Sequence, residues 1–359
     1  MSAVEPRRIS RDEILDWLRE NKSARLDELW RQADEVRRQQ VGDAVHLRGL
    51  IEIGNHCTRQ CAYCGLRAPN TGVERYRMTE DEILSSARDA QRYGYGTVVM
   101  QSGEDYGFTA EWIAGVVRRV KREAGLAVTL SFGERPDEDL ALWREAGADR
   151  YLLRFETSDP QLYALIHPSR DGRPSRPEDR LDKLGVLRDL GYETGSGVMI
   201  GIPGQTYESL ADDIALFGDL DLDMVGVGPY IMHPDTPLGR GEVQLPDAGE
   251  RQVPSSELMG YKVVALTRLT CPEANIPSTT ALATLNYEQG RELGLMRGAN
   301  VVMPNITPAA YRYLYQIYPA KACIQESAED FHSAIHQRIS AIGRTVGQGP
   351  GGRLGVLRR

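Results

Sequence analysis

Apolar residues show two different patterns of spacing along the chain, and the pattern changes after Gly42. In the first forty positions Ile14, Leu15, Leu18 and Leu26 recur at helical spacing, with charged residues between them. Beyond Gly42, short β-branched or apolar runs alternate with amphipathic stretches, which predicts a long succession of strands and helices. The candidate strands are Val45–Ile53, Thr97–Gln101, Ala127–Phe132, Arg150–Phe155, Gly195–Gly201, Met224–Tyr230, Ile276–Ala281 and Asn300–Met303.

Helical stretches lie between most of these candidate strands. One of them begins at Thr79, where Thr79-Glu80-Asp81-Glu82 has the sequence of a capping box. Several end at a glycine, which is typical of a left-handed residue after a helix. The remaining helical stretches are Trp112–Ala124, Glu138–Ala146, Pro177–Leu190, Glu208–Leu220, Glu257–Leu269 and Glu288–Arg297.

Eight alternations of strand and helix predict an α/β fold, a closed (β/α)8 barrel of the TIM type. An open, partial barrel is the second possibility. We expect an N-terminal helical extension over residues 1–42, the barrel over 43–320, and a C-terminal helix and flexible tail over 321–359. The tail after Gly343 is rich in glycine and is expected to be loosely ordered.

Charge and composition narrow the class of protein. The chain has 359 residues and a net charge of −8, which argues against a nucleic-acid or membrane partner, because both usually need a basic face. It has no apolar run long enough to cross a membrane and no signal-peptide core at its start, so we expect a cytoplasmic location. The five cysteines are too few for a disulfide framework.

Three of the cysteines form the sharpest motif in the sequence. Cys57, Cys61 and Cys64 have the spacing C-x3-C-x2-C and directly follow the first predicted strand. In a β/α barrel the carboxyl ends of the strands carry the chemistry. Three thiolates can bind three irons of a cubane cluster and leave the fourth iron open. The alternative, a zinc site with His56 as fourth ligand, is disfavoured because adjacent ligands give poor tetrahedral geometry.

This motif, with an aromatic residue just before its last cysteine, resembles the radical S-adenosylmethionine (SAM) superfamily. The resemblance implies one [4Fe–4S] cluster on the three cysteines and SAM as cosubstrate. The amino and carboxylate groups of SAM would chelate the open iron, and an electron passed to the sulfonium would release a 5′-deoxyadenosyl radical. The aromatic residue, Tyr63, would lean on the adenine.

Segments after later strands fit the same resemblance. Ser102-Gly103-Glu104 is similar to the family's G-G-E segment, with Ser102 in place of the first glycine. The glycine-dense stretch 195–206 resembles the segment near the adenine. The residues expected to contact SAM are Tyr63, Ser102, Gly103, Glu104, Glu156, Arg180, Met199 and Ile231, with Arg180 suited to a bidentate pair with the SAM carboxylate.

Longer stretches resemble the HydE family of [FeFe]-hydrogenase maturases over nearly the whole chain. Among them are Tyr76–Thr79, Ala148–Arg154, Asn275–Thr280, Gly298–Asn305 and Tyr311–Pro319. The resemblance implies a cysteine-bound iron complex carrying CO and cyanide as a small-molecule substrate, whose sulfur the adenosyl radical attacks. It also implies a reductase or flavodoxin-type electron donor and other hydrogenase maturases as partners. The residues expected to line the substrate cavity and serve catalysis are Arg150, Thr279, Thr280, Met303 and Tyr315.

The sequence departs from this family at two places. Some HydE proteins bind a second cluster near the C-terminus, but of that cysteine set only Cys323 remains, with Phe331 and Ala334 where partners would stand. We therefore expect one cluster. Phe155 occupies a position where the family often has histidine.

Two other functions remain open at this point. A related radical SAM mutase, similar to methylornithine synthase, would share the fold and the cysteine motif. A protein of a different class, a non-catalytic scaffold that binds a metal or a cluster, would share only the cysteines. Biotin synthase needs ligands for a second cluster, and the sequence does not supply them.

Overall fold

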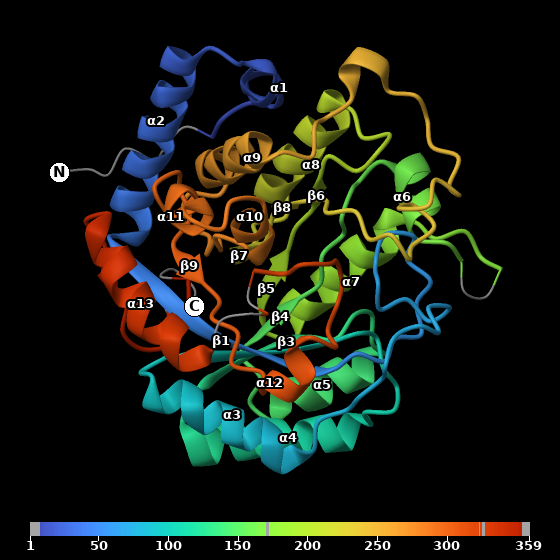
Figure 1. Ribbon diagram of the computed structural model, residues 1–359, viewed down its shortest axis with the longest axis vertical. Coiled ribbons are helices and arrows are strands. Elements are labelled where there is room, and N and C mark those ends of the chain that lie inside the picture. Colours follow the sequence, from blue (N-terminus) through green and yellow to red (C-terminus); the bar gives the residue numbers. More distant parts are fainter. Residues whose placement is uncertain (1–7, 170–171, 323, 325–326, 354–359) are drawn as a thin grey trace.

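A computed structural model describes residues 8–169, 172–322, 324 and 327–353. Eight β segments surround a common interior, and most of the helices lie around them (Figure 1). None of the helices within the described ranges combines the length and the apolar character that crossing a bilayer requires.

The strands pair in parallel and in sequence order, which confirms the predicted barrel. The central sheet runs β1, β2, β3, β4, β5, β7, and β9 returns to pair with β1. Single bridges from Met224 to Asn275 and from Pro277 to Val301 complete the ring. The bounds are β1 (Ala44–Gly54), β2 (Thr97–Ser102), β3 (Ala127–Ser131), β4 (Arg150–Leu152), β5 (Glu193–Ser196), β6 (Met199–Ile200), β7 (Met224–Val225), β8 (Gly228–Pro229), β9 (Val301–Val302) and β10 (Thr345–Val346).

Several helices begin where the sequence provides a capping side chain. The capping box predicted at Thr79 is present, and Thr109, Thr206 and Ser256 cap three further helices. The long helices are α1 (Arg11–Arg19), α2 (Ser23–Val41), α3 (Glu80–Arg92), α4 (Ala110–Ala124), α5 (Asp137–Glu145), α7 (Pro177–Asp189), α8 (Tyr207–Asp219), α9 (Glu257–Thr270) and α13 (Ala328–Ala341). The short ones are α6 (Pro160–Ile166), α10 (Thr280–Leu285), α11 (Gly290–Leu295), α12 (Ala309–Arg312) and the 3-10 turn η1 (Gly249–Arg251).

Two differences between the structure and the predicted elements lie close to the carboxyl ends of the strands. The predicted strand Ile276–Ala281 contributes one bridge at Pro277 and then gives way to α10, for which Thr279 is the N-cap residue. The helix α6 was not predicted. It is only seven residues long, too short for a periodic apolar signal, and it depends on Asp159, which caps it, and on Pro160 in its first turn.

The predicted N-terminal helices pack on one side of the barrel, against α8 and α9. Arg11 on α1 forms an ion pair with Asp212 on α8, its Nε lying 2.8 Å from Oδ1. Lys262 on α9 is buried, and its ammonium group donates to the carbonyl of Leu18 at 3.0 Å. These contacts hold the extension on the outside of the barrel, away from the strand ends.

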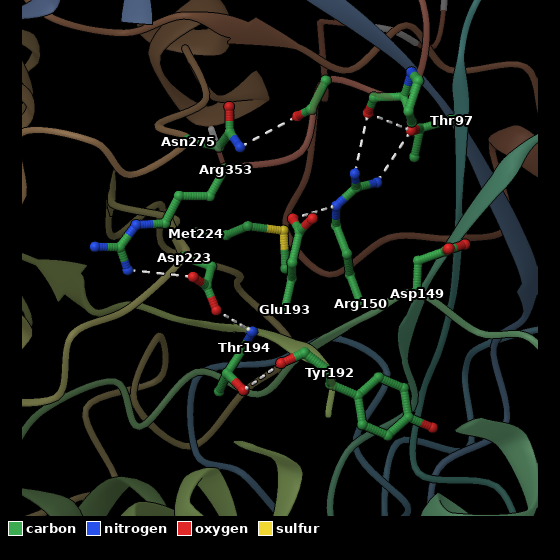
Figure 2. A network of polar contacts seen from close by, with 12 residues as sticks. Thr97, Asp149, Arg150, Tyr192, Glu193, Thr194, Asp223, Met224, Asn275 and Arg353 are labelled. Carbon is green, nitrogen blue, oxygen red and sulfur yellow. Dashed lines mark hydrogen bonds and ion pairs between the residues drawn. The ribbon is translucent and has the colours of Figure 1, made fainter. Parts of the chain in front are cut away.

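The glycine-rich tail was expected to be loosely ordered, but its described part crosses the amino ends of the strands and is bound there. We call residues 347–353 the floor segment. The Pro350 carbonyl accepts from Thr97 and Arg150 (Figure 2). The Gly351 carbonyl accepts from Arg48 and Asn275. The backbone carbonyls of this glycine-rich segment accept hydrogen bonds from buried donors, and these bonds fix its position.

Glycine is required in this segment by close approach. A side chain at Gly351 would collide with His46, and one at Gly352 would collide with Glu193. Arg353 then forms ion pairs with Asp221, Asp223 and Glu273. The amino end of the barrel is therefore covered by the chain itself, and the carboxyl end carries the cysteine loop.

Candidate active site

The cysteine loop leaves β1 at its carboxyl end and is held by backbone contacts to distant segments. Asn55 is fully buried, and its side-chain amide donates to the carbonyls of Glu74 and Leu314. Arg75 donates to four carbonyls of the loop, those of residues 55, 66, 67 and 70. A guanidinium group that satisfies four carbonyls fixes a segment that has no regular secondary structure.

The three thiols of this loop are free, half-buried and close enough to influence one another. Burial raises the pKa of Cys61 to about 11, with the charge of Arg180 opposing that rise and the charge of Cys57 adding to it. Burial, then Cys61 and Cys57, raise the pKa of Cys64. Bound iron cations would lower the pKa of these thiols again, because a positive metal charge favours the thiolate.

Two features beside Cys57 fit a cluster at this place. The backbone N–H of Arg59 donates to the Cys57 sulfur at 3.4 Å, and hydrogen bonds of this kind are known to tune iron–sulfur clusters. A Cβ at Gly103 would lie 2.7 Å from the Cys57 Cβ, so glycine lets the loop after β2 approach the cysteines.

No three His, Cys, Asp or Glu side chains in the described ranges converge on a single metal ion. A cubane needs no such convergence, because each thiolate binds its own iron.

A network of two carboxylates and two guanidinium groups borders the cysteine loop. Glu134 Oε1 accepts from Arg59 Nη2 at 2.6 Å and from Arg180 Nε at 2.8 Å. The second carboxylate, Glu104, accepts from the Glu134 backbone N–H at 2.9 Å. Arg180 also donates to the carbonyl of Arg154. Arg59, inside the cysteine motif, is thus tied to the segments after β2 and β3 and to α7.

Burial raises the pKa of the Glu104 carboxyl, and Arg59 opposes that rise. At Glu134 burial acts in the same direction, but Arg180 and Arg59 outweigh it and lower the pKa. The Arg180 guanidinium stays charged, since the tyrosine and carboxylate groups around it more than offset its burial. Arg180 therefore provides a fixed positive charge within this network.

Tyr63 lies against α6 in a small apolar group separate from the main core. Its hydroxyl is 3.0 Å from Nε2 of His167, which is buried, and the two rings meet edge to face. The apolar group consists of Ala62, Leu162, Ile166, Met199, Ile202, Tyr230 and Leu238, with Tyr63 at its edge. The structure thus brings Tyr63 and Met199 together, and it places Ile231 two residues beyond β8, half-buried.

Glu156 follows β4 at the carboxyl end and is almost fully buried. Its Oε2 atom lies 3.1 Å from Arg154 Nη2 but accepts no hydrogen bond from any described residue. Its charge is one of the contributions that raise the pKa of Cys64, after burial, Cys61 and Cys57. This carboxylate therefore lies near the cysteine loop, as expected of a residue at the end of a barrel strand.

The predicted substrate residues are placed as follows. Thr279 occupies the N-cap position of α10 without a side-chain capping bond, and its buried hydroxyl lacks a hydrogen-bond partner among the described residues. It lies beside Gly228 on β8, where a Cβ would come within 3.2 Å of the threonine Oγ1. Thr280 opens α10, and Met303 follows β9; both are half-buried. Tyr315 is buried, with the ammonium group of Lys321 4.9 Å from its ring centroid.

Arg150 lies at the opposite end of the barrel from the cysteines. It is the first residue of β4, and its guanidinium group donates to Glu193, Thr97 and the Pro350 carbonyl (Figure 2). The structure does not bring it together with Thr279 or Tyr315, because a residue at the amino end of a strand faces the floor segment. Arg154, four residues later, is the arginine at the carboxyl end.

Several residues that shape the site were missed by sequence reasoning. Glu134 and Arg75 are ordinary charged residues in sequence, and only the fold shows that each has several partners. A further pair, Glu52 and Lys321, is buried in the interior, where Lys321 also donates to the Tyr315 carbonyl. Glu52 gave a usable signal: it is a charged residue inside the apolar run 50–53 of the first strand.

Known proteins resemble the chain along its whole length. Residues 51–217 match the Radical SAM superfamily. The chain is 44% identical to the [FeFe] hydrogenase maturase subunit HydE of Thermotoga maritima, over 99% of this chain and 97% of that protein. It is 27% identical to 3-methylornithine synthase of Methanosarcina acetivorans, over 95% of this chain and 91% of that protein.

Solved structures agree on the fold. The crystal structure of methylornithine synthase (PylB) superposes with a TM-score of 0.80 over 96% of both chains, at 24% identity. The hydrogenase maturase HydG from Carboxydothermus hydrogenoformans superposes with a TM-score of 0.69 over 83% of this chain and 68% of that one, at 19% identity. At these identities the superpositions establish architecture alone. The near full-length identity to HydE is the finer evidence, and it shows that the chain is a radical SAM enzyme that belongs to the HydE family.

Proposed function

We propose that this protein reductively cleaves SAM at one [4Fe–4S] cluster on Cys57, Cys61 and Cys64, and that it acts in assembly of the [FeFe]-hydrogenase cofactor. The radical SAM superfamily implies the cluster and SAM themselves. The observation that carries the proposal is the 44% identity to a HydE maturase over 97% of that protein. The three free thiols on one loop after β1 support it.

The surrounding residues would bind and orient SAM. When bound, the cluster supplies the electron that breaks a carbon–sulfur bond of SAM. Arg180 offers a charged guanidinium group for the SAM carboxylate, and Glu156 offers a buried carboxylate for the amino or ribose groups. Tyr63, Met199 and Ile231 would contact the adenine, and Ser102-Gly103-Glu104 the amino group.

The substrate we propose is a small cysteine-bound iron complex carrying CO and cyanide. Thr279 supports this assignment, because its buried hydroxyl has no partner among the described residues and could bond to a polar ligand. Thr280, Met303 and Tyr315 would complete the substrate site. A flavodoxin-type reductase as electron donor, and other hydrogenase maturases as partners, belong to the same proposal.

The decisive experiment is the replacement Cys61→Ser, with Cys271→Ser as the matched control. Cys271 is a free cysteine buried in the core, remote in sequence from the motif. After anaerobic reconstitution, we expect the control to retain about four irons per chain and SAM cleavage, and Cys61→Ser to lose both. Full cleavage by Cys61→Ser would refute the ligand assignment. Eight irons per chain in the unaltered protein would refute the single cluster.

A second assay distinguishes this function from that of a radical SAM mutase. The mutase is the second candidate because the chain is 27% identical to 3-methylornithine synthase. The reconstituted protein is given SAM, reductant and a synthetic cysteine-bound iron carbonyl cyanide complex. We expect an adenosyl adduct that requires the complex. Formation of 3-methylornithine from an amino-acid precursor, with no such adduct, would instead establish the mutase.

A further inference from the structure

Glu156 occupies a strained backbone position. Its φ is +68°, and the N–H of Thr157 donates to the carbonyl of Phe155 at 2.9 Å. A hydrogen bond across a single residue with positive φ defines a rare and strained γ-turn. Non-glycine residues hold such geometry only where their surroundings enforce it, and such positions cluster at functional sites. Something in the fold must therefore hold this turn in place.

One side of the turn is held by the neighbouring barrel segment. The Glu156 N–H donates to the carbonyl of Gly197 at 3.1 Å, and the Glu156 carbonyl accepts from Met199 at 3.2 Å. These bonds form a parallel bridge to Val198. They fix the backbone of Glu156 itself but not the residues that follow it.

The other side is held by a single buried carboxyl group. The N–H and the hydroxyl of Ser158 both donate to Oδ1 of Asp213, each at 2.6 Å. Asp213 lies on α8 and is completely buried. Since no solvent competes for it, this carboxyl group can hold Ser158 in one position.

The same anchor reaches the cysteine loop through α6. Asp159, next to Ser158, caps α6 by accepting from the N–H groups of Gln161 and Leu162. At the far end of α6, the Ile166 carbonyl accepts from the N–H of Ala62, between two of the cluster cysteines. Residues 155–166 thus form one connected unit that extends from the turn to the loop.

We propose that Asp213 is a positioning residue: through Ser158 it holds the strained turn that sets the Glu156 carboxylate toward SAM. The proposal rests on the proposed function, in which Glu156 binds SAM. Asp213 does not touch SAM or the cluster; it acts through Ser158 and Glu156.

The protonation of Asp213 gives the proposal a distinctive signature. Burial raises its pKa to about 7, with the Ser158 hydrogen bonds opposing that rise and the charge of nearby Asp159 adding to it. Its neighbour Asp212 on α8 is paired with Arg11 at the surface. Because the pKa is raised, the neutral form is favoured below pH 7, and raising the pH above 7 puts a charge into the buried site.

The variants are Asp213→Asn and Asp213→Ala, with Asp212→Asn as the matched control on the same helix. The amide of Asp213→Asn keeps the oxygen that accepts from Ser158, and Asp213→Ala removes it. Two quantities are measured: the Kd for SAM of the cluster-loaded protein, and hydrogen exchange of residues 155–162 in the cluster-free protein. Glu156→Ala is measured in parallel.

We expect Asp213→Ala to weaken SAM binding at least about tenfold and to speed exchange over residues 155–162, because it leaves buried donors unpaired. Asp213→Asn should stay within about twofold of the unaltered protein at pH 6.5, since it preserves the bonds. Between pH 6.5 and 8.5 the unaltered protein should lose SAM affinity and protection from exchange, corrected for the intrinsic pH effect. Asp213→Asn should lose neither, and Asp212→Asn should follow the unaltered protein.

The positioning role is overturned if Asp213→Ala leaves exchange over residues 155–162 unchanged. It is equally overturned if Asp213→Asn loses SAM affinity as severely as Asp213→Ala. Failure of the underlying assignment looks different: Glu156→Ala would then bind SAM normally, while the exchange data still report whether Asp213 holds the turn. Should Asp213→Ala not fold, Asp213→Asn and the pH series decide the question alone.

Discussion

At the scale of single residues, Glu134 connects more of the site than any motif suggested. Its carboxylate accepts from both Arg59 and Arg180. Burial raises its pKa, but the two arginines lower it further, so the net pKa lies below the ordinary value. A lowered pKa means that the charged form stabilises the fold above the unfolded-state pKa, and that this contribution is lost as the pH falls through the folded-state pKa.

The corresponding prediction concerns Glu134→Gln in the cluster-free protein. We expect a loss of about 1–3 kcal/mol in the free energy of unfolding at pH 7, since the amide oxygen still accepts from the two arginines but no longer carries the negative charge that strengthens those bonds. The difference should shrink below about pH 4, where the unaltered carboxylate becomes protonated. Urea denaturation across this pH range measures it. Glu35→Gln, on an exposed helical ion pair with Arg38, is the control and should change little. An equal loss at pH 7 and pH 3.5 would contradict the argument.

The sequence predicts candidate site residues best where residue type and spacing together indicate the chemistry, and the structure places these residues close to one another. Cys57, Cys61 and Cys64 share one loop after β1, and Tyr63 lies in the same loop. Arg150 shows the limit. A charged residue in a strand can face either end of the barrel, and only the exact start of β4 determines which. The buried partners of Arg150 come from segments distant in sequence, so no local sequence pattern predicts them.

At the scale of elements, helix starts proved the most predictable feature because caps are local. The Thr79 hydroxyl accepts from the N–H of Glu82, whose carboxylate accepts in turn from the N–H of Thr79. The strand expected at Ile276–Ala281 failed because its few apolar residues fit either period. Only the single bridges to β7 and β9 show that a short part of the segment, at residues 275–277, takes a place in the barrel sheet.

We predict that Thr79→Ala lowers the free energy of unfolding by about 1 kcal/mol, because α3 loses the side-chain acceptor for its first turn. Thr79→Ser retains the hydroxyl and should restore most of that stability. Chemical denaturation of both variants measures the difference. If serine proved as costly as alanine, the lost methyl group rather than the cap would be responsible.

At the scale of the whole molecule, the floor segment connects residues of several different barrel strands through its backbone carbonyls. Arg48 is buried, and burial, with Arg150 adding, lowers its pKa to about 9. Its bond to the Gly351 carbonyl is 2.9 Å, and its other partner is the Met224 sulfur, a weak acceptor. Without the floor segment this guanidinium group would lose its strongest acceptor.

Truncation tests this dependence. A chain ending after Val346 loses the carbonyls of Pro350 and Gly351 and the Arg353 ion pairs, so we expect at least about 3 kcal/mol of lost stability. A chain ending after Arg353 keeps all of these contacts and should be more stable than the shorter chain by that amount. Denaturation midpoints and hydrogen exchange of β1 and β4 provide the measurement. Equal stability of the two truncated chains would show that the floor segment is dispensable.

The distance along the chain between Arg48 and its acceptor also orders events during synthesis. These two residues are 303 positions apart, and the cysteine loop begins directly after the strand that carries Arg48. The first strand therefore emerges from the ribosome 303 residues before the carbonyl that accepts from Arg48 in the folded protein. Iron loaded before that moment would meet an unfinished barrel, so metallation should follow translation rather than accompany it.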